Sequence, residues 1–251
     1  MRISRRDTAA SPAVRAFVIG ANRWEEADRW PLPGARERVY FPPSRGSAGG
    51  TGTAAGTGLL LGRRPKDSAA DSYRYDPSDP VPTVGGANFH LFHSNLGPLD
   101  QREVEQRRDV LSYTTPPFDA GAVLAGPVSA TLYVSSTARD ADFTAKLVLV
   151  RPDGYARIVE DGIIRARYHD SLRRPELRAR HHRARRHSAR GGRGARLRLE
   201  VSSGNFPKYD RNPQTGENPA TATVLAPATH TVHHGGAYPA ALRVWLRKAR
   251  R

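Results

Sequence analysis

Three histidines near the end of the chain could take part in chemistry, because imidazole is a common metal ligand and general base. His230, His233 and His234 stand in the sequence His-Thr-Val-His-His. In a strand, the two adjacent histidines would face opposite sides of the sheet. Since no carboxylate stands at ligand spacing, the sequence predicts surface histidines and no metal site.

A serine nucleophile of the α/β-hydrolase type needs the pentapeptide Gly-x-Ser-x-Gly on a strained turn between a strand and a helix. The sequence contains no such pentapeptide: Ser47 lies in a glycine-rich loop, but Arg45 stands where the first glycine is needed. A Walker loop, a dinucleotide fingerprint and His-Glu-x-x-His are also absent, and there is no cysteine. The sequence therefore predicts no catalytic residue and no cofactor.

Two acids close in sequence, Asp140 and Asp142, precede an apolar run and could form a carboxylate pair. Loop carboxylates of this kind more often accept hydrogen bonds from backbone amides. We therefore expect them to be structural. The remaining binding candidates are aromatic residues with polar neighbours, each of which is more often a packing residue than a ligand contact: Trp24, Trp30, Phe89, Phe92 and Tyr209.

The net charge of the 251-residue chain is +16, which raises the question of a nucleic-acid partner. Most of this charge lies in two places, Arg173–Arg198 and Arg243–Arg251, and the rest of the chain is nearly neutral. Residues 178–196 contain only Arg, His, Ala, Gly and Ser, so they cannot bury enough apolar surface to offset their ordering entropy. Three interpretations stay open: a basic arm for nucleic acid, a solvated loop, or coding sequence read out of frame.

Apart from these tracts, the hydropathy pattern is that of β-strands. Val128, Ala130, Leu132 and Val134 alternate with polar residues, as do two further sets, Phe143/Ala145/Leu147/Leu149 and Leu197/Leu199/Val201. Shorter apolar runs stand at 16–19, 110–113, 163–166 and 221–225, with Gly and Pro turns between them. We expect short helical turns only after Asp100 and within Trp24–Trp30. The predicted fold class is all-β, a sandwich or jelly roll of antiparallel strands with long loops.

The expected organisation is one domain. Residues 1–13 would be an N-terminal extension, 14–242 a β-sandwich with an aberrant arginine-rich insert at 178–196, and 243–251 a frayed basic tail. No stretch is apolar enough for a transmembrane helix or a signal peptide, so a cytoplasmic location and no membrane partner are expected.

Six blocks of the sequence carry a family resemblance, in the order Phe17–Pro33, Asp71–Gly86, Gly97–Thr115, Gly126–Gly154, Asp161–Leu177 and Arg196–Gly216. Together they resemble the C-terminal jelly-roll domain, galactose-binding-like in fold, of the X-prolyl dipeptidyl-peptidase and cocaine esterase (CocE/NonD) serine hydrolases. The resemblance implies a partner, an α/β-hydrolase domain that carries the Ser–Asp–His triad. It also implies that Trp24, Asn88 and Phe89 line the substrate cleft on the side of the jelly roll.

The chain departs from the family pattern in two places. The triad-bearing domain has no counterpart here, and the arginine-rich tract replaces a strand and a turn that the family typically has. We therefore expect an accessory domain without activity of its own, its core left incomplete and sheet edges exposed. The alternatives are a stand-alone module for carbohydrate or a small molecule and, less favoured, a nucleic-acid binder that uses the arginine-rich arm.

Overall fold

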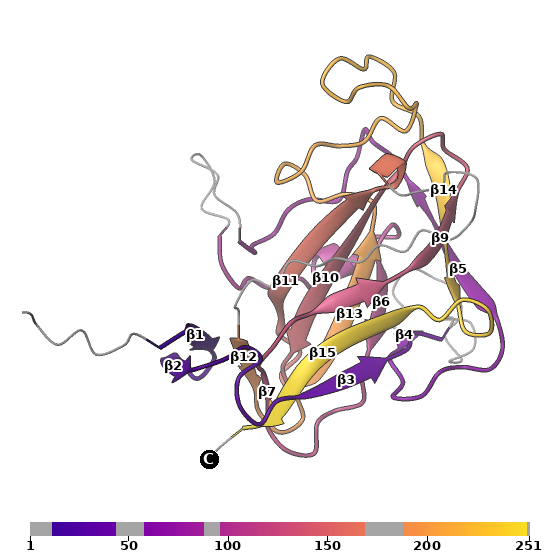
Figure 1. Ribbon diagram of the computed structural model, residues 1–251. Coiled ribbons are helices and arrows are strands. Elements are labelled where there is room, and N and C mark those ends of the chain that lie inside the picture. The colour runs from indigo at the N-terminus through magenta and orange to yellow at the C-terminus, as the bar shows by residue number, and fades with distance from the viewer. Residues whose placement is uncertain (1–11, 44–57, 88–95, 169–187, 250–251) are drawn as a thin grey trace, which may run out of the picture.

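The computed structural model describes residues 12–43, 58–87, 96–168 and 188–249. These residues form a β-sandwich, in which β15 and β3 cross in front of β10, β11 and β13 (Figure 1). Helical structure in the described residues is limited to two 3-10 turns, η2 (Val104–Gln106) and η3 (Ala166–Tyr168). The turn η2 lies where the sequence predicted one.

The first sheet follows the order β2-β1-β12-β7-β15-β3, and β8 also pairs with β15. Its strands are β1 (Val14–Ile19), β2 (Arg23–Ala27), β3 (Arg36–Tyr40), β7 (Ala122–Leu124), β8 (Ser129–Thr131), β12 (Ser188–Gly191) and β15 (Ala241–Lys248). All of its pairs are antiparallel except β1 with β12.

The second sheet has the order β11-β10-β13-β6-β4, and a third has the order β5-β14-β9. Their strands are β4 (Gly58–Leu59), β5 (Ala69–Tyr75), β6 (Leu111–Thr114), β9 (Tyr133–Ser136), β10 (Asp142–Val150), β11 (Ala156–Arg165), β13 (Arg196–Ser202) and β14 (Ala228–His234). Only β4 with β6 is parallel. The predicted all-β sandwich is thus confirmed, with two parallel pairs among mainly antiparallel ones.

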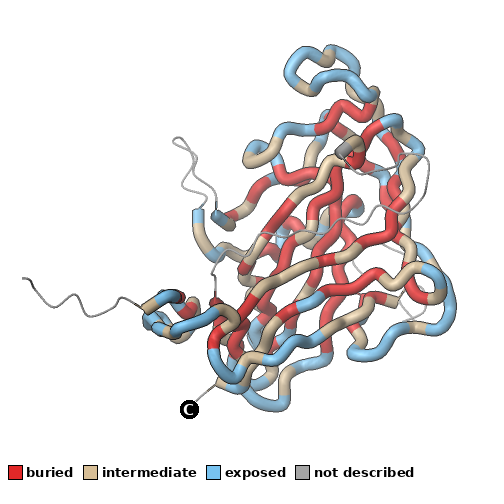
Figure 2. Tube along the Cα trace, viewed as in Figure 1, coloured by how far each residue is buried: buried red, intermediate tan, exposed pale blue. Residues whose placement is uncertain are grey.

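The main core lies between the sheets and is built from the residues whose alternation predicted it. Ala130, Leu132 and Val134 are buried in it together with Phe143, Leu147 and Leu149 of β10 and Leu197, Leu199 and Val201 of β13. Figure 2 shows these buried stretches through the middle of the sandwich and exposed residues in its outer loops. Alternation predicts this core because successive side chains of a strand point to opposite faces.

Gly126 separates β7 from β8 at a point where no side chain fits. A Cβ there would lie 2.8 Å from the Cβ of Pro31 and closer still to Trp245. The chain can therefore continue from β7 to β8, which both pair with β15, only because this residue is glycine.

Four expectations about strands were wrong. Residues 188–191 of the arginine-rich tract form β12, with Ser188 and Ala189 buried, because small side chains fit beside β7. Residues 243–248 are not frayed but belong to β15, where Val244 is fully buried between β3 and β7. Residues 23–27 are a strand rather than a turn, since they pair along β1. Residues 221–225 form no strand.

Candidate functional site

The hairpin of β1 and β2 carries Trp24, the one predicted cleft residue that lies in the described part of the chain. Trp24 is 60% exposed and Phe17 38% exposed, and their rings meet edge to face with centroids 5.4 Å apart. The guanidinium of Arg15 lies 5.4 Å from the centre of the Trp24 ring. Exposed aromatic residues grouped in this way are typical of interaction surfaces.

The hairpin is held in place by a small core beneath β1 and by an ion pair between β2 and β15. Val14, Ala16 and Val18 alternate with the exposed residues of β1 and are buried in a small core with Leu32. Glu25 forms ion pairs with Arg247 of β15 and with Arg23. Burial raises the pKa of Glu25, but the hydrogen bonds from the two arginines outweigh it, so that pKa lies below its usual value. The aromatic pair is thus presented on a supported strand.

Of the other predicted site residues, Trp30 and Tyr209 lie in the described part of the chain. Asn88 and Phe89 lie outside the described residues, as does Phe92, so their place in a cleft stays a prediction. Trp30 packs against the small core. Tyr209 lies beside the Lys208 ammonium, which is 5.4 Å from its ring centre.

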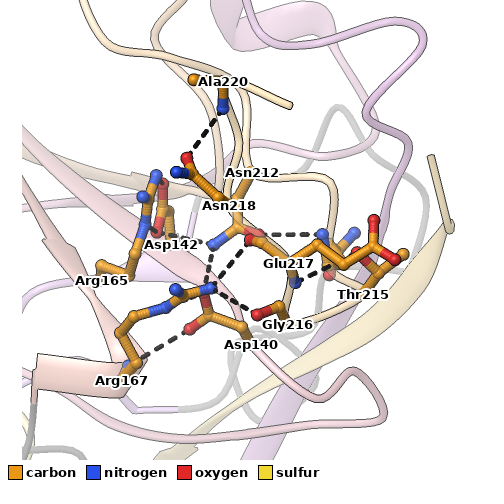
Figure 3. Close-up of polar contacts among 11 residues, drawn as sticks. Asp140, Asp142, Arg165, Arg167, Asn212, Thr215, Gly216, Glu217, Asn218 and Ala220 are labelled. Atoms are coloured by element: carbon orange, nitrogen blue, oxygen red, sulfur yellow. Dashed lines mark hydrogen bonds and ion pairs between the residues drawn. The ribbon is translucent and has the colours of Figure 1, made fainter. Parts of the chain in front are cut away.

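Asp140 and Asp142 belong to a buried polar cluster between β10, β11 and the segment after Tyr209 (Figure 3). Arg165 binds Asp142 through two hydrogen bonds of 2.8 Å, and Arg167 donates to Asp140 from its Nε at 2.7 Å. Asn212 Nδ2 donates to both acids, at 3.1 and 2.9 Å. Both carboxylates thus accept hydrogen bonds from cationic and amide donors, as expected of structural groups.

This cluster also positions the long loop that follows it. Arg167 Nη2 donates to the carbonyl oxygens of Gly216 and Glu217, both at 3.2 Å. The Arg167 backbone amide donates to Asp140 at 3.2 Å, which is the amide-capping role predicted from the sequence. The acids therefore connect the start of β10, the end of β11 and the loop around Gly216 (Figure 3).

A serine and an acid each contact a histidine on β14, but not the same histidine. Ser135 Oγ lies 2.9 Å from His233 Nε2, and Asp71 Oδ2 lies 3.1 Å from His234 Nε2. His233 and His234 are adjacent in the strand and therefore face opposite sides. A Ser–His–Asp relay needs one imidazole between the other two groups, so the described residues do not form one here.

The expectation of surface histidines was wrong for His230 and His234, which are fully buried. Every second side chain of β14 points into the protein interior. On this side His230 packs against Tyr73 and Phe143, and His234 packs against Tyr113. Among the described residues, neither ring nitrogen of His230 has a hydrogen-bond partner. Burial lowers the pKa of His230 to about 4, so its ring is neutral near pH 7.

The outer face of the second sheet holds a lysine and a glutamate that the alternation had placed on a polar face. Lys146 and Glu200 are each only 2% exposed and lie opposite one another on β10 and β13. Lys146 Nζ lies 3.4 Å from Gln101 Oε1, and the Glu200 carboxyl group interacts with Lys146 and with the neighbouring carboxyl group of Glu105. Burial, assisted by the neighbouring Glu105, raises the pKa of Glu200 to about 8 against the opposing charge of Lys146.

We expect the substitution Glu200→Gln to change how stability depends on pH. The folded chain keeps the Glu200 proton up to about pH 8, whereas the unfolded chain releases it near 4.5. The wild type should therefore lose stability as the pH rises through this window, and the amide, which has no proton to release, should lose less. Urea unfolding at pH 5 and pH 8 measures this difference. Parallel pH profiles for the two proteins would contradict it.

Within residues 12–43, 58–87, 96–168 and 188–249, no group of three or more His, Asp or Glu side chains is arranged to hold a metal ion. No helix in these ranges has the length and apolar character needed to cross a bilayer.

Comparison with known proteins identifies the family. Residues 7–182 and 188–243 match the model of the X-Pro dipeptidyl-peptidase C-terminal non-catalytic domain. The cocaine esterase of Rhodococcus sp. (strain MB1 Bresler) is 41% identical over 92% of this chain. The break in the family match lies inside the arginine-rich tract, where the sequence resemblance also fails.

Solved structures show the same fold. An aminopeptidase from a marine sediment Thaumarchaeota archaeon superposes with a TM-score of 0.74 at 27% identity, over 94% of this chain and 40% of that one. An alpha-amino acid ester hydrolase superposes with a TM-score of 0.70 at 23% identity, over 94% of this chain and 41% of that one. The chain spans 41% of the length of the Rhodococcus esterase. This chain belongs to the CocE/NonD hydrolase family as its C-terminal non-catalytic domain.

Proposed function

We propose that this domain packs on an α/β-hydrolase domain, forms one wall of its active-site cleft and contributes to assembly. The assembled enzyme would cleave acyl esters or X-prolyl peptides through a seryl ester, with stabilisation of the oxyanion. The observation that carries the proposal is the match to a non-catalytic domain by a chain that spans 41% of a relative named as an esterase. The reactive groups would come from the partner domain.

The surface best suited to this docking is the outer face of the β1–β2 hairpin, with Arg15, Phe17 and Trp24. It presents aromatic rings and a cation on a supported strand, and burying such rings is a common source of binding energy. Asn88 and Phe89 would lie on the cleft side of the same assembly, as the family resemblance implies.

The substitution Trp24→Ser should weaken association with a hydrolase domain at least about tenfold, because an exposed ring of this kind is typical of a binding hot spot. The partner to use is the part of the Rhodococcus cocaine esterase that this chain does not match. The two are co-purified, and both complex formation and ester hydrolysis are measured.

Val224→Ser is the matched control, because Val224 is also exposed, at 57%, but lies in the loop before β14. It should leave association unchanged. If Trp24→Ser binds as well as the wild type, the hairpin is not the docking surface. If the wild type forms no complex at all, the proposed partnership is wrong.

The domain alone should not turn over an activated acyl ester or an Ala-Pro chromogenic amide above the rate in buffer. The reason is that the sequence has no nucleophile pentapeptide, and the histidine contacts described above form no relay. Turnover that persists through purification and is abolished by a serine-directed phosphonate would refute the assignment of the chemistry to a partner.

A further inference from the structure

An open hollow of about 1100 Å³ lies on one side of the sandwich. It separates the edge strand β3 from the segment 115–121, which links β6 to β7. The side chains that matter for its chemistry are those of Arg36, Arg38, Tyr40, Phe118, Leu246 and Lys248. Its volume lies slightly above the range of about 300–1,000 Å³ that is typical of pockets for small organic ligands.

The floor of the hollow is apolar. Tyr40, Phe118 and Leu246 are partly buried and pack against the main core. Tyr40 shares this inward face because it lies opposite Leu242, a buried core residue, in the pairing of β3 with β15. Burial raises the pKa of the Tyr40 hydroxyl, so this residue offers an uncharged ring and hydroxyl.

The rim of the hollow is cationic, and the register of β3 with β15 explains where its arginines lie. Arg36 and Arg38 lie opposite Leu246 and Val244, so the two arginines project from the core-facing side of β3. Both are exposed, and neither guanidinium group forms an ion pair or hydrogen bond with any part of the chain that the structure describes. Their Cα atoms are about 7 Å apart, two residues along one strand.

An arginine on the inward face of an edge strand can also protect that edge from pairing with another chain. That role does not require an apolar floor beneath the charges, nor an open hollow beside them. Here two unpaired guanidinium groups and Lys248 surround a floor with two aromatic rings, and Asp119 is the acid in the lining.

We infer that this hollow binds a small organic acid, with its aromatic or aliphatic body on Tyr40, Phe118 and Leu246 and its carboxylate between Arg36 and Arg38. Guanidinium groups bind carboxylates through paired, charge-assisted hydrogen bonds. A polyanion such as nucleic acid would need a longer row of cations and would meet the charge of Asp119. The inference does not depend on the proposed hydrolase partnership.

The test is isothermal titration calorimetry of the full chain with 4-phenylbutyrate and, separately, with the neutral 4-phenylbutanol. We expect the acid to bind at one site and the alcohol to bind at least about tenfold more weakly, since the charged hydrogen bonds are absent. Affinity for the acid should also fall when sodium chloride is raised from about 0.05 to about 0.5 M.

The double substitution Arg36→Gln and Arg38→Gln should weaken binding of 4-phenylbutyrate at least about tenfold. The matched control is Arg74→Gln, because Arg74 is also an exposed strand arginine but lies on β5. Thermal melting of both variants checks that they fold, as expected for exposed side chains. Absence of binding by the wild type, equal affinity for acid and alcohol, or an unchanged double variant would each overturn the inference.

Discussion

Replacing Asp142 with alanine is expected to lower the free energy of unfolding by about 3–5 kcal/mol, the usual cost of breaking a buried ion pair from one side. The Asp142 side chain is only 1% exposed, and Arg165, its direct partner across β10 and β11, is 21% exposed. The substitution leaves the Arg165 guanidinium without its two carboxylate acceptors. It also removes one acceptor of the buried Asn212 amide.

The loss should be measured by urea unfolding near pH 7, followed by circular dichroism. The matched control is Asp153→Ala, because Asp153 also pairs with an arginine, Arg151, but both side chains are about half exposed. Surface ion pairs contribute only about 0–1 kcal/mol, so this variant should unfold almost like the wild type. Equal losses for the two variants would show that burial of the Asp142 pair does not determine its contribution.

Replacing His230 with phenylalanine is expected to remove much of the loss of stability that the domain undergoes in mild acid. The folded chain takes up the His230 proton only near pH 4, whereas the ordinary histidine value is 6.5. As the pH falls from 6.5 to 4, the unfolded chain therefore binds the proton more readily, and folding loses up to about 3 kcal/mol at this residue. Phenylalanine fits the site because His230 already packs against Tyr73, Tyr75 and Phe143.

Unfolding free energies at pH 7.5 and pH 4.5 for the wild type and His230→Phe measure this effect. The control is Tyr73→Phe, which changes a ring in contact with His230 but removes no group that titrates in acid. This control should differ from the wild type by a similar amount at both pH values. If His230→Phe loses as much stability in acid as the wild type, the buried imidazole is not the acid-sensitive group.

The alternation of apolar and polar residues correctly predicted which side chains of β10 and β13 face the core. It wrongly predicted that the polar side chains on the opposite face would be exposed. Leu147 and Leu199 were expected in the core and lie there, but Lys146 and Glu200 on the opposite face are buried as well. Gln101, which contacts the Lys146 ammonium, comes from a segment distant in sequence from both residues. Periodicity is a local property, so it does not show whether a distant loop will cover the polar face of a strand.

The sequence by itself determined the all-β class, the residues of the main core, the family and the absence of a nucleophile pentapeptide. The family follows from the resemblance of six sequence blocks to known proteins, and the others follow from residue types and short-range spacing. Only the tertiary structure decided that β12 and β15 are integral strands, that His230 and His234 are buried, and that Arg36 and Arg38 border a hollow with an apolar floor. The physical reason is that these outcomes depend on which strands become neighbours, and strand pairing brings together residues far apart in the chain.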